Sequence, residues 1–424
     1  MELTKVKLSD VARVEISGVD KKSKPGQKSV RLCNFVDVYH NWAITQDMRD
    51  SFMEATASDK EIEALSIKKG QVAFTKDSET RDDIGIPTYI ADDFDDVVLG
   101  YHNALITPDE RKLNGKYLNA FMHSSYIQKY FENNASGSGQ RYTLSNDTVN
   151  SIPILLPSIK DQEKIGNLFS FIDRKIALNK KMNQKLEAMA KRLYDYWFVQ
   201  YDFPDKNGHP YKNTGGKMEY NPTLKREIPV GWEVKQICDI AKIFNGSTPS
   251  TTEEGNYGGE IVWITPKDLS DQNCKFVYQG ARNITQAGYD SCSTTMVPKG
   301  TVVMSSRAPI GLLSIAQCDL CTNQGFKNMV PNDMTDSKYL YYTIQQHIPQ
   351  IQNLGTGTTF KEVSKDELGR FAILYPPKKL ITTFEEKMAP IFDVQFNKVK
   401  EISRLTALRD KLLPLLMNGQ VVVG

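Results

Sequence analysis

The chain has 424 residues and a formal net charge of +2, and 40% of its residues are hydrophobic while 25% are charged. This composition is ordinary for soluble globular protein, and the length is too great for one core but suits two domains of about 150 residues with connectors. The near-zero charge excludes a strongly basic chain, so contact with nucleic acid would need locally basic loops.

Cysteine usage and hydropathy indicate the compartment. The six cysteines are scattered, which is typical of a reducing cytosol rather than of a disulfide framework. No run of about 18 apolar residues occurs, and residues 1–5 lack the apolar stretch of a secretory signal. We therefore expect a cytoplasmic protein that makes no contact with a membrane.

Residues 1–158 predict a first domain, in which short β-like runs are mixed with short helical ones. Residues 71–74 and 152–156 have the composition of strands, and residues 118–131 carry apolar and aromatic side chains at helical spacing. The pattern indicates an α/β domain of the mixed α+β kind, with a mixed sheet whose strand order the sequence leaves open.

Residues 159–200 predict one long helix, the central spacer helix. Apolar residues recur every three or four positions, glycine is nearly absent and proline is missing. Asn179 falls on this apolar stripe, where a polar residue costs stability but can fix the register against a partner helix.

The remainder of the chain repeats this organisation. Residues 201–229 form a polar connector, residues 230–377 predict a second domain, and residues 378–424 predict a distal spacer helix and tail, with Pro390 at its start or at a kink. The corresponding segments of the two copies are 69–74 and 299–304, 116–118 and 338–340, 137–139 and 355–357, and 154–157 and 373–376. Two like domains on one chain suit a target that has two half-sites.

Each long helix carries an apolar stripe with heptad-like spacing that it cannot bury alone. The simplest arrangement pairs the two helices as an antiparallel coiled coil, with the two domains related by an approximate two-fold axis. The alternative is that each helix packs only on its own domain. The residues expected at this subunit and coil interface are Ile172, Ile176, Asn179, Met182, Leu186, Leu193, Trp197, Ile391, Ile402, Leu405 and Leu412.

Residues 186–204 closely resemble the central region of the DNA-specificity (S) subunits of type I restriction–modification systems, and residues 215–218, 224–232 and 405–419 resemble the same family. The resemblance covers essentially the whole chain and is strongest in the helices and the connector. It implies that each domain is a target recognition domain for one half of a split site in double-stranded DNA. It further implies that the helices space these domains and dock two methyltransferase (M) subunits, which recruit two restriction/translocase (R) subunits.

Matching loops in the two domains are the candidates for DNA contact. Arg can form two hydrogen bonds with the edge of guanine, and Gln can do so with adenine. Glu can accept a hydrogen bond from cytosine, while Lys and Thr mostly contact phosphate. An ordinary surface loop is the alternative reading of each. Lys267 lies in a run that resembles a loop of the same family. The full set of candidates is Thr75, Lys76, Ser78, Glu79, Gln140, Arg141, Tyr142, Lys267, Ser305, Ser306, Arg307, Thr358, Thr359 and Lys361.

No catalytic or metal-binding motif is evident. The Asn-Pro-Pro-aromatic motif of amino-methyltransferases and the GxxxxGK[ST] phosphate loop are both missing. The pair Cys318 and Cys321 has no second pair, so buried strand cysteines are favoured over zinc. We therefore expect a non-catalytic chain without a cofactor of its own, with S-adenosylmethionine, ATP and magnesium used by the partner subunits. The alternatives are a fused restriction–methyltransferase protein and a coiled-coil adaptor without a DNA role.

Overall fold

The computed structural model describes residues 2–137, 139–272, 274–356 and 361–424. The chain divides into two compact units, which cut across its two long helices. Unit 1 holds residues 1–180 and 400–424, and unit 2 holds residues 181–399. Among the described residues, no helix is both long and apolar enough to cross a membrane.

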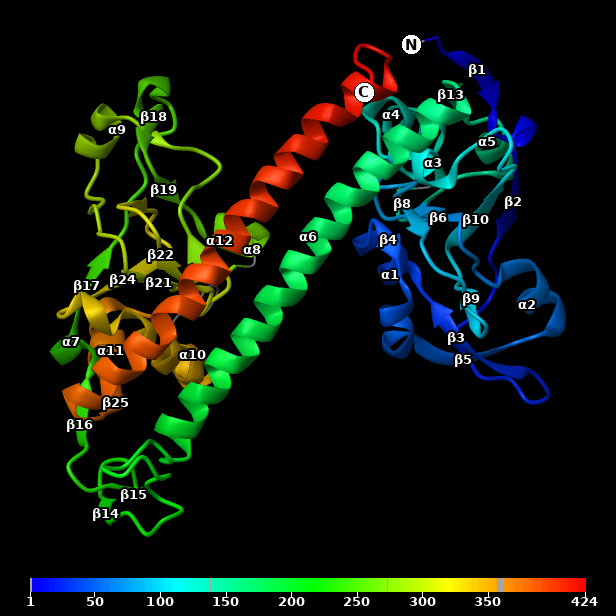
Figure 1. The fold of residues 1–424 in the computed structure, drawn as a ribbon. Helices are drawn as coiled ribbons and strands as arrows, with labels where there is room; N and C mark the ends of the chain where they lie inside the picture. Colours follow the sequence, from blue (N-terminus) through cyan, green and yellow to red (C-terminus); the bar gives the residue numbers. More distant parts are fainter. Residues whose placement is uncertain (1, 138, 273, 357–360) are drawn as a thin grey trace. The chain divides into compact units, whose positions relative to one another are not determined.

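Unit 1 is built on a five-stranded sheet (Figure 1). Its strand order is β2 (Ala12–Ile16), β10 (Asn103–Pro108), β6 (Val72–Thr75), β8 (Pro87–Ile90) and β4 (Ala43–Ile44). The other strands are β5 (Met53–Ala57), β3 (Lys28–Cys33) and β9 (Val97–Leu99) in one sheet, β1 (Thr4–Lys7) with β13 (Pro153–Leu156), and β11 (Ser136–Gly137), β12 (Tyr142–Thr143) and β7 (Asp77–Ser78) in a third. The helices are α1 (Phe35–His40), α2 (Asp59–Leu65), α3 (Gly115–Met122), α4 (Ser125–Asn134) and α5 (Asn146–Asn150).

Unit 2 is built on a second five-stranded sheet. Its strand order is β17 (Ala241–Asn245), β24 (Phe326–Pro331), β21 (Val302–Ser305), β22 (Leu313–Ala316) and β20 (Phe276–Val277). The other strands are β19 (Trp263–Ile264) with β23 (Cys321–Thr322), β16 (Glu233–Gln236) with β25 (Ala372–Tyr375), β14 (Met218–Asn221) with β15 (Arg226–Pro229), and β18 (Tyr257–Ile261). The helices are α7 (Ile237–Ile240), α8 (Pro266–Gln272), α9 (Gln286–Asp290), α10 (Ser337–Leu354) and α11 (Lys365–Gly369).

The two sheets have the same register, which confirms the internal repeat. Thr75 lies opposite Asn103 in unit 1, and Ser305 lies opposite Phe326 in unit 2. In each sheet the edge strand β4 or β20 pairs parallel to its neighbour, while the other pairs of strands are antiparallel. The domains are therefore mixed α/β, as predicted, and the strand order comes only from the structure.

One predicted helical stretch is interrupted. Residues 118–131 belong to two helices, because Ser124 has extended backbone between α3 and α4. The break allows Phe121 and Phe131 both to reach the core, where neither side chain is exposed to solvent.

The two long helices are α6 (Ile159–Tyr194), which continues as a π-helical turn over Asp195–Val199, and α12 (Lys378–Met417). Pro390 lies inside α12, so it does not mark the beginning of the helix.

The helix segments within each unit run antiparallel, as predicted. In unit 1, Lys164 donates to the carbonyl of Val423 at 3.3 Å, and Lys175 pairs with Glu401 at 3.4 Å. In unit 2, the amides of Asn183 and Gln395 donate to each other's backbone carbonyls at 3.2 and 3.3 Å, and the ring centroids of Tyr194 and Phe384 lie 6.1 Å apart. In both units, later residues of α6 therefore meet earlier residues of α12.

The buried face of α6 differs from the prediction at one position. Ile172, Ile176, Asn179 and Trp197 are buried, whereas Met182 is 37% exposed. The prediction for Met182 is wrong, because a period of 3.6 residues places Asn183, rather than Met182, on the side of α6 that contacts α12. Five further predicted interface residues are intermediate in exposure: Leu186, Leu193, Ile391, Ile402 and Leu405. Leu412 is likewise half-buried, against the core of unit 1.

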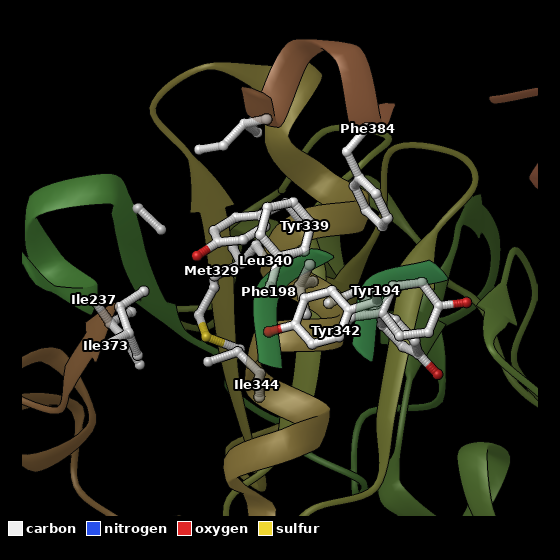
Figure 2. Packing of buried hydrophobic residues seen from close by; sticks show 14 of the residues in the cluster. Tyr194, Phe198, Ile237, Met329, Tyr339, Leu340, Tyr342, Ile344, Ile373 and Phe384 are labelled. Atoms are coloured by element: carbon white, nitrogen blue, oxygen red, sulfur yellow. The ribbon is translucent and has the colours of Figure 1, made fainter. Parts of the chain in front are cut away.

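The ends of the helices also pack into the domain cores. Figure 2 shows this in unit 2, where Phe198 lies 5.0 Å from both Tyr339 and Phe384, measured between ring centroids. In unit 1, Phe169 of α6 is fully buried in the cluster that holds Tyr117. Each helix therefore contacts both the other helix and a domain, which combines the two alternatives that the sequence left open.

Candidate nucleic-acid interface

The two candidate loops of unit 1 meet in the small sheet β11–β12–β7. Ser78 pairs with Tyr142, and Asp77 pairs with Thr143. The backbone N–H of Leu144 also donates to the carbonyl of Lys76 at 3.0 Å. The structure thus brings together residues that are more than 60 positions apart.

A group of charged side chains joins these strands at their base. Lys76 Nζ donates to Thr143 Oγ1 at 2.9 Å and lies 3.3 Å from Asp77, whose other oxygen is 2.5 Å from His102 Nδ1. Burial raises the pKa of Asp77, but hydrogen bonds from Thr143 and His102 and the positive charge of Lys76 outweigh it, so this pKa lies below its usual value. Lys76 is therefore engaged inside the domain, and its contribution to external charge is reduced.

Unit 2 has the same junction with different residues. The backbone of Glu362 forms isolated antiparallel β-bridges with Arg307 and with Thr356. The N–H of Val363 donates to the carbonyl of Ser306 at 3.0 Å, in the same way as the N–H of Leu144 donates to the carbonyl of Lys76. Lys327 supplies the buried charge, with Nζ 3.0 Å from Glu362 Oε1. Both units therefore fasten two loops to the end of the central strand.

Burial corrects the expectation for three candidates. Thr75, Ser305 and Ser306 have no exposed surface, so they cannot present side chains to DNA in this conformation. Thr75 Oγ1 accepts from the N–H of Ile86 at 3.0 Å, and Ser305 Oγ accepts from Leu312 N at 2.8 Å. These hydroxyls occupy the last positions of the central strands or follow them directly, so they hold the loops instead of forming their outer surface.

The remaining candidates differ in exposure. Glu79, Gln140, Arg141, Lys267 and Lys361 are exposed. Ser78, Tyr142 and Arg307 are half-buried, as is Lys76. Thr358 and Thr359 lie outside the described residues.

Lys267 lies on α8, beside the loop that carries Arg307. The N–H of Thr265 donates to Asp268 at 2.7 Å and caps α8, as Asn34 and Asp37 cap α1 in unit 1 at the same distance. Pro266 packs against Gly325, where an added Cβ would lie 3.0 Å from Pro266 Cγ, and Gly325 accepts from the N–H of Ser306. The structure thus brings the first turn of α8, which carries Lys267, close to Ser306 at the end of the central strand.

Two exposed arginines were missed by the sequence reasoning. The Arg81 guanidinium lies 5.0 Å from the ring centroid of Tyr142, and that of Arg282 lies 3.8 Å from the ring centroid of Tyr257. In each pair the partners are far apart in sequence, so no local motif signals the contact.

Metal-binding side chains do not gather in the part of the chain that the structure describes, since no group of three or more His, Cys, Asp or Glu could hold an ion there. Cys321 is buried, and burial raises the pKa of its thiol to about 11. Cys318 donates to the carbonyl of Tyr278 at 3.4 Å. Cys321 is therefore a buried strand cysteine, as predicted, whereas the prediction is wrong for Cys318, which is half-buried in a bend between β22 and β23.

Comparisons with known proteins give one consistent family. The family model of the type I restriction modification DNA specificity domain matches residues 2–188 and again residues 229–406. The chain is 26% identical over 409 residues to the type I restriction enzyme HindI specificity subunit of Haemophilus influenzae, covering 84% of this chain and 87% of that protein. It is 38% identical over 187 residues to the type I restriction enzyme MjaIX specificity subunit of Methanocaldococcus jannaschii, covering 44% of this chain and 43% of that protein.

A solved structure has the same fold. The type I restriction–modification S subunit from M. genitalium aligns with 98% of this chain and 96% of its own length, with a TM-score of 0.60. Because the identity is only 14%, this likeness is evidence for the fold alone.

Proposed function

Because the chain belongs to the family of type I restriction modification DNA specificity domains, as a specificity subunit with two target recognition domains, we propose that each domain reads one half of a split DNA site. The observation that carries this proposal is the repeated junction of two loops at the end of the central strand, formed by Ser78 with Tyr142 and by Arg307 with Glu362. Two equivalent surfaces on one chain suit a target with two half-sites.

The charge of the exposed loops supports contact with DNA. Arg141 and Lys267 are exposed at these surfaces, although the net charge of the chain is only +2. A locally basic surface on a nearly neutral chain suits a DNA reader, because phosphate contacts supply affinity and base edges supply specificity.

The long helices are the proposed docking surface for two methyltransferase subunits. Four large apolar side chains of α6 are exposed to solvent: Phe171 (67%), Leu178 (51%), Met182 (37%) and Met189 (59%). Within each unit the two exposed residues are 7 positions apart, Phe171 and Leu178 in unit 1 and Met182 and Met189 in unit 2, and at 3.6 residues per turn this spacing falls on one face of the helix. An exposed apolar stripe of this kind is typical of a surface that a partner helix covers.

The chemistry of restriction and modification belongs, in this proposal, to partner subunits. The methyltransferase subunits would use S-adenosylmethionine, and two restriction/translocase subunits held by them would use ATP and magnesium. The relatives with matching length are named specificity subunits, which supports a binding role for this chain rather than catalysis.

The test is the methylome of cells that carry this chain with its methyltransferase partner. We expect methylation within one split motif that has a fixed gap. Methyl transfer by the purified chain alone would instead support the fused enzyme, and unmethylated genomic DNA with no protected DNA in a footprint of the complex would support the adaptor.

Docking is tested separately by co-purification. Phe171→Asp and Met189→Asp should lose the methyltransferase subunit, because a charge is costly in a buried apolar interface. Gln184→Asp is the matched control, since residue 184 is exposed on another face of α6. Equal retention of the partner by all three variants would contradict the proposed surface.

A further inference from the structure

Each unit presents one exposed arginine stacked on a tyrosine. Arg81 follows β7 and lies over Tyr142 of β12, and Arg282 lies over Tyr257 of β18. Neither guanidinium has a carboxylate within 4 Å in the ranges 2–137, 139–272, 274–356 and 361–424. Their hydrogen-bond donors are therefore not consumed by an ion pair.

Stacking changes what an arginine can do. The ring holds the guanidinium plane through a cation–π contact, so less side-chain entropy is lost when a ligand binds. The planar group keeps its fork of N–H donors, which matches the O6 and N7 acceptors of guanine in the major groove. A stacked arginine is thus pre-organised for bidentate contact, which a lysine cannot make.

The stacked arginine of unit 1 belongs to the candidate loop surface. Tyr142, which supports Arg81, pairs with Ser78 in the small sheet. Two residues after Arg81, Asp83 accepts hydrogen bonds from the hydroxyl of Tyr39 on α1, at 2.8 Å. The loop is therefore held at both sides of Arg81, by β12 and by α1.

The stacked arginine of unit 2 lies in a different segment of the repeat, after the edge strand β20, but beside the equivalent short helix. The N–H of Ala281, directly before Arg282, donates at 2.8 Å to Asp268, the capping residue of α8. Helix α8 corresponds to α1, because each follows a strand in parallel pairing and begins with the same capping bonds. Both arginines are thus anchored beside the equivalent short helix.

The other arginines of the predicted surface lack these features. Arg307 is half-buried, and its backbone forms a bridge with Glu362. Arg141 is exposed, and it has no ring contact with any residue that the structure describes.

We propose that Arg81 and Arg282 are the specificity-determining arginines, each bonding a guanine in the half-site read by its own unit. This inference rests on the proposed function, since it names the readers within the two recognition domains. Tyr142 and Tyr257 are positioning residues, which act by holding the arginine above their rings.

The first experiment compares methylomes of cells that carry the methyltransferase partner with the wild-type chain, Arg81→Lys or Arg282→Lys. Arg81→Lys should relax one G·C position in one half of the motif, and Arg282→Lys should relax one G·C position in the other half. Arg111→Lys and Arg370→Lys are matched controls, because both residues are exposed, lie outside these loops and keep their charge. The controls should leave the motif unchanged.

The second experiment measures binding of the chain–methyltransferase complex to a labelled duplex that carries the wild-type motif. Losing a bidentate pair should weaken binding of Arg81→Lys by roughly 5- to 150-fold. Tyr142→Leu, which keeps the arginine but removes its support, should weaken binding by roughly 2- to 5-fold. Circular dichroism of each variant separates a loss of binding from a loss of folding.

The outcomes are distinguishable. If the wild-type methylome shows a split motif and both lysine variants retain it with unchanged affinity, the assignment of Arg81 and Arg282 is overturned while the proposed function stands. Equal weakening on every sequence would identify phosphate contacts, and would also overturn the assignment. A wild-type chain that directs no split motif would defeat both proposals.

Discussion

Replacing Glu187 with glutamine should leave the ammonium of Lys275 buried without its counter-charge. Lys275 lies just before β20 and its side chain is only 8% exposed, while Glu187 of α6 is 33% exposed. The pair forms a direct hydrogen bond inside unit 2. It therefore connects the recognition domain to the helix segment in the same unit.

The remaining contacts of Lys275 limit the expected loss. The ammonium also donates to the hydroxyl of Tyr342 at 3.1 Å and lies 3.9 Å from the ring centroid of Phe392. Breaking a buried ion pair costs about 3–5 kcal/mol, and because these contacts persist we expect about 3 kcal/mol. In a unit of about 200 residues, that corresponds to a fall of about 6–12 °C in its melting temperature.

The loss should depend on pH. Burial lowers the pKa of Lys275 below its usual value, although Glu187 counteracts this. Between that lowered pKa and the unfolded pKa of about 10.4, the unfolded chain binds more protons, so stability rises with pH. Glutamine removes the counteracting charge and lowers the pKa of Lys275 further, so the stability deficit of the variant should be smaller at pH 10 than at pH 7.

The assay is urea unfolding of the full chain at pH 7 and pH 10, followed by fluorescence, with the transition of unit 2 fitted separately. The double variant Lys275→Met with Glu187→Leu is the control, and it should regain most of the lost stability because no unpaired charge remains. Equal losses for Glu187→Gln at the two pH values would refute the electrostatic reasoning. A double variant that is no more stable than Glu187→Gln would show that packing, rather than the unpaired charge, sets the cost.

Two predictions concern unit 1. Burial, aided by the nearby Arg409, lowers the pKa of His123 to about 3, and the ring stacks on Trp42 at 4.1 Å. Since the unfolded pKa is about 6.5, acidification to pH 5 should cost the wild type about 2 kcal/mol through this residue. His123→Phe should abolish that loss in urea titrations at pH 7.5 and pH 5, and unchanged acid sensitivity would contradict the argument. Gly115→Ala should lower the free energy of unfolding of unit 1 by about 1–3 kcal/mol, because its Cβ would lie 2.0 Å from the carbonyl oxygen of Gly70. Gly18→Ala in the same unit, whose added Cβ would meet no atom within 4 Å, is the control, and equal free energies of unfolding for the two variants would contradict the predicted clash.

Local patterns were sufficient for the large features of the fold. The apolar period of residues 159–200 predicted α6, because a helix repeats every 3.6 residues and leaves a direct trace in the sequence. The recurrence of Lys-Gly turns before residues 72 and 302 predicted equivalent strands, and β6 and β21 confirm them. The prediction failed at Met182, because a few degrees of helical rotation per residue decide whether Met182 or the next residue, Asn183, faces α12.

Local sequence patterns predicted the candidate site only in part. The sequence located both loops, but side-chain exposure depends on where each strand ends, so Thr75, Ser305 and Ser306 could not be distinguished from their exposed neighbours. Arg81 and Arg282 were missed for a related reason, since their tyrosine partners are supplied by other elements of the fold.

The sequence by itself determined the duplication, the two long helices and the family, because these depend on residue types and spacings along the chain. The tertiary structure alone decided the strand order, the burial of Thr75, Ser305 and Ser306, and the pairing of loops at Ser78 and Glu362. The physical reason is that these features are contacts between residues distant in sequence, which form only when the sheets and cores close.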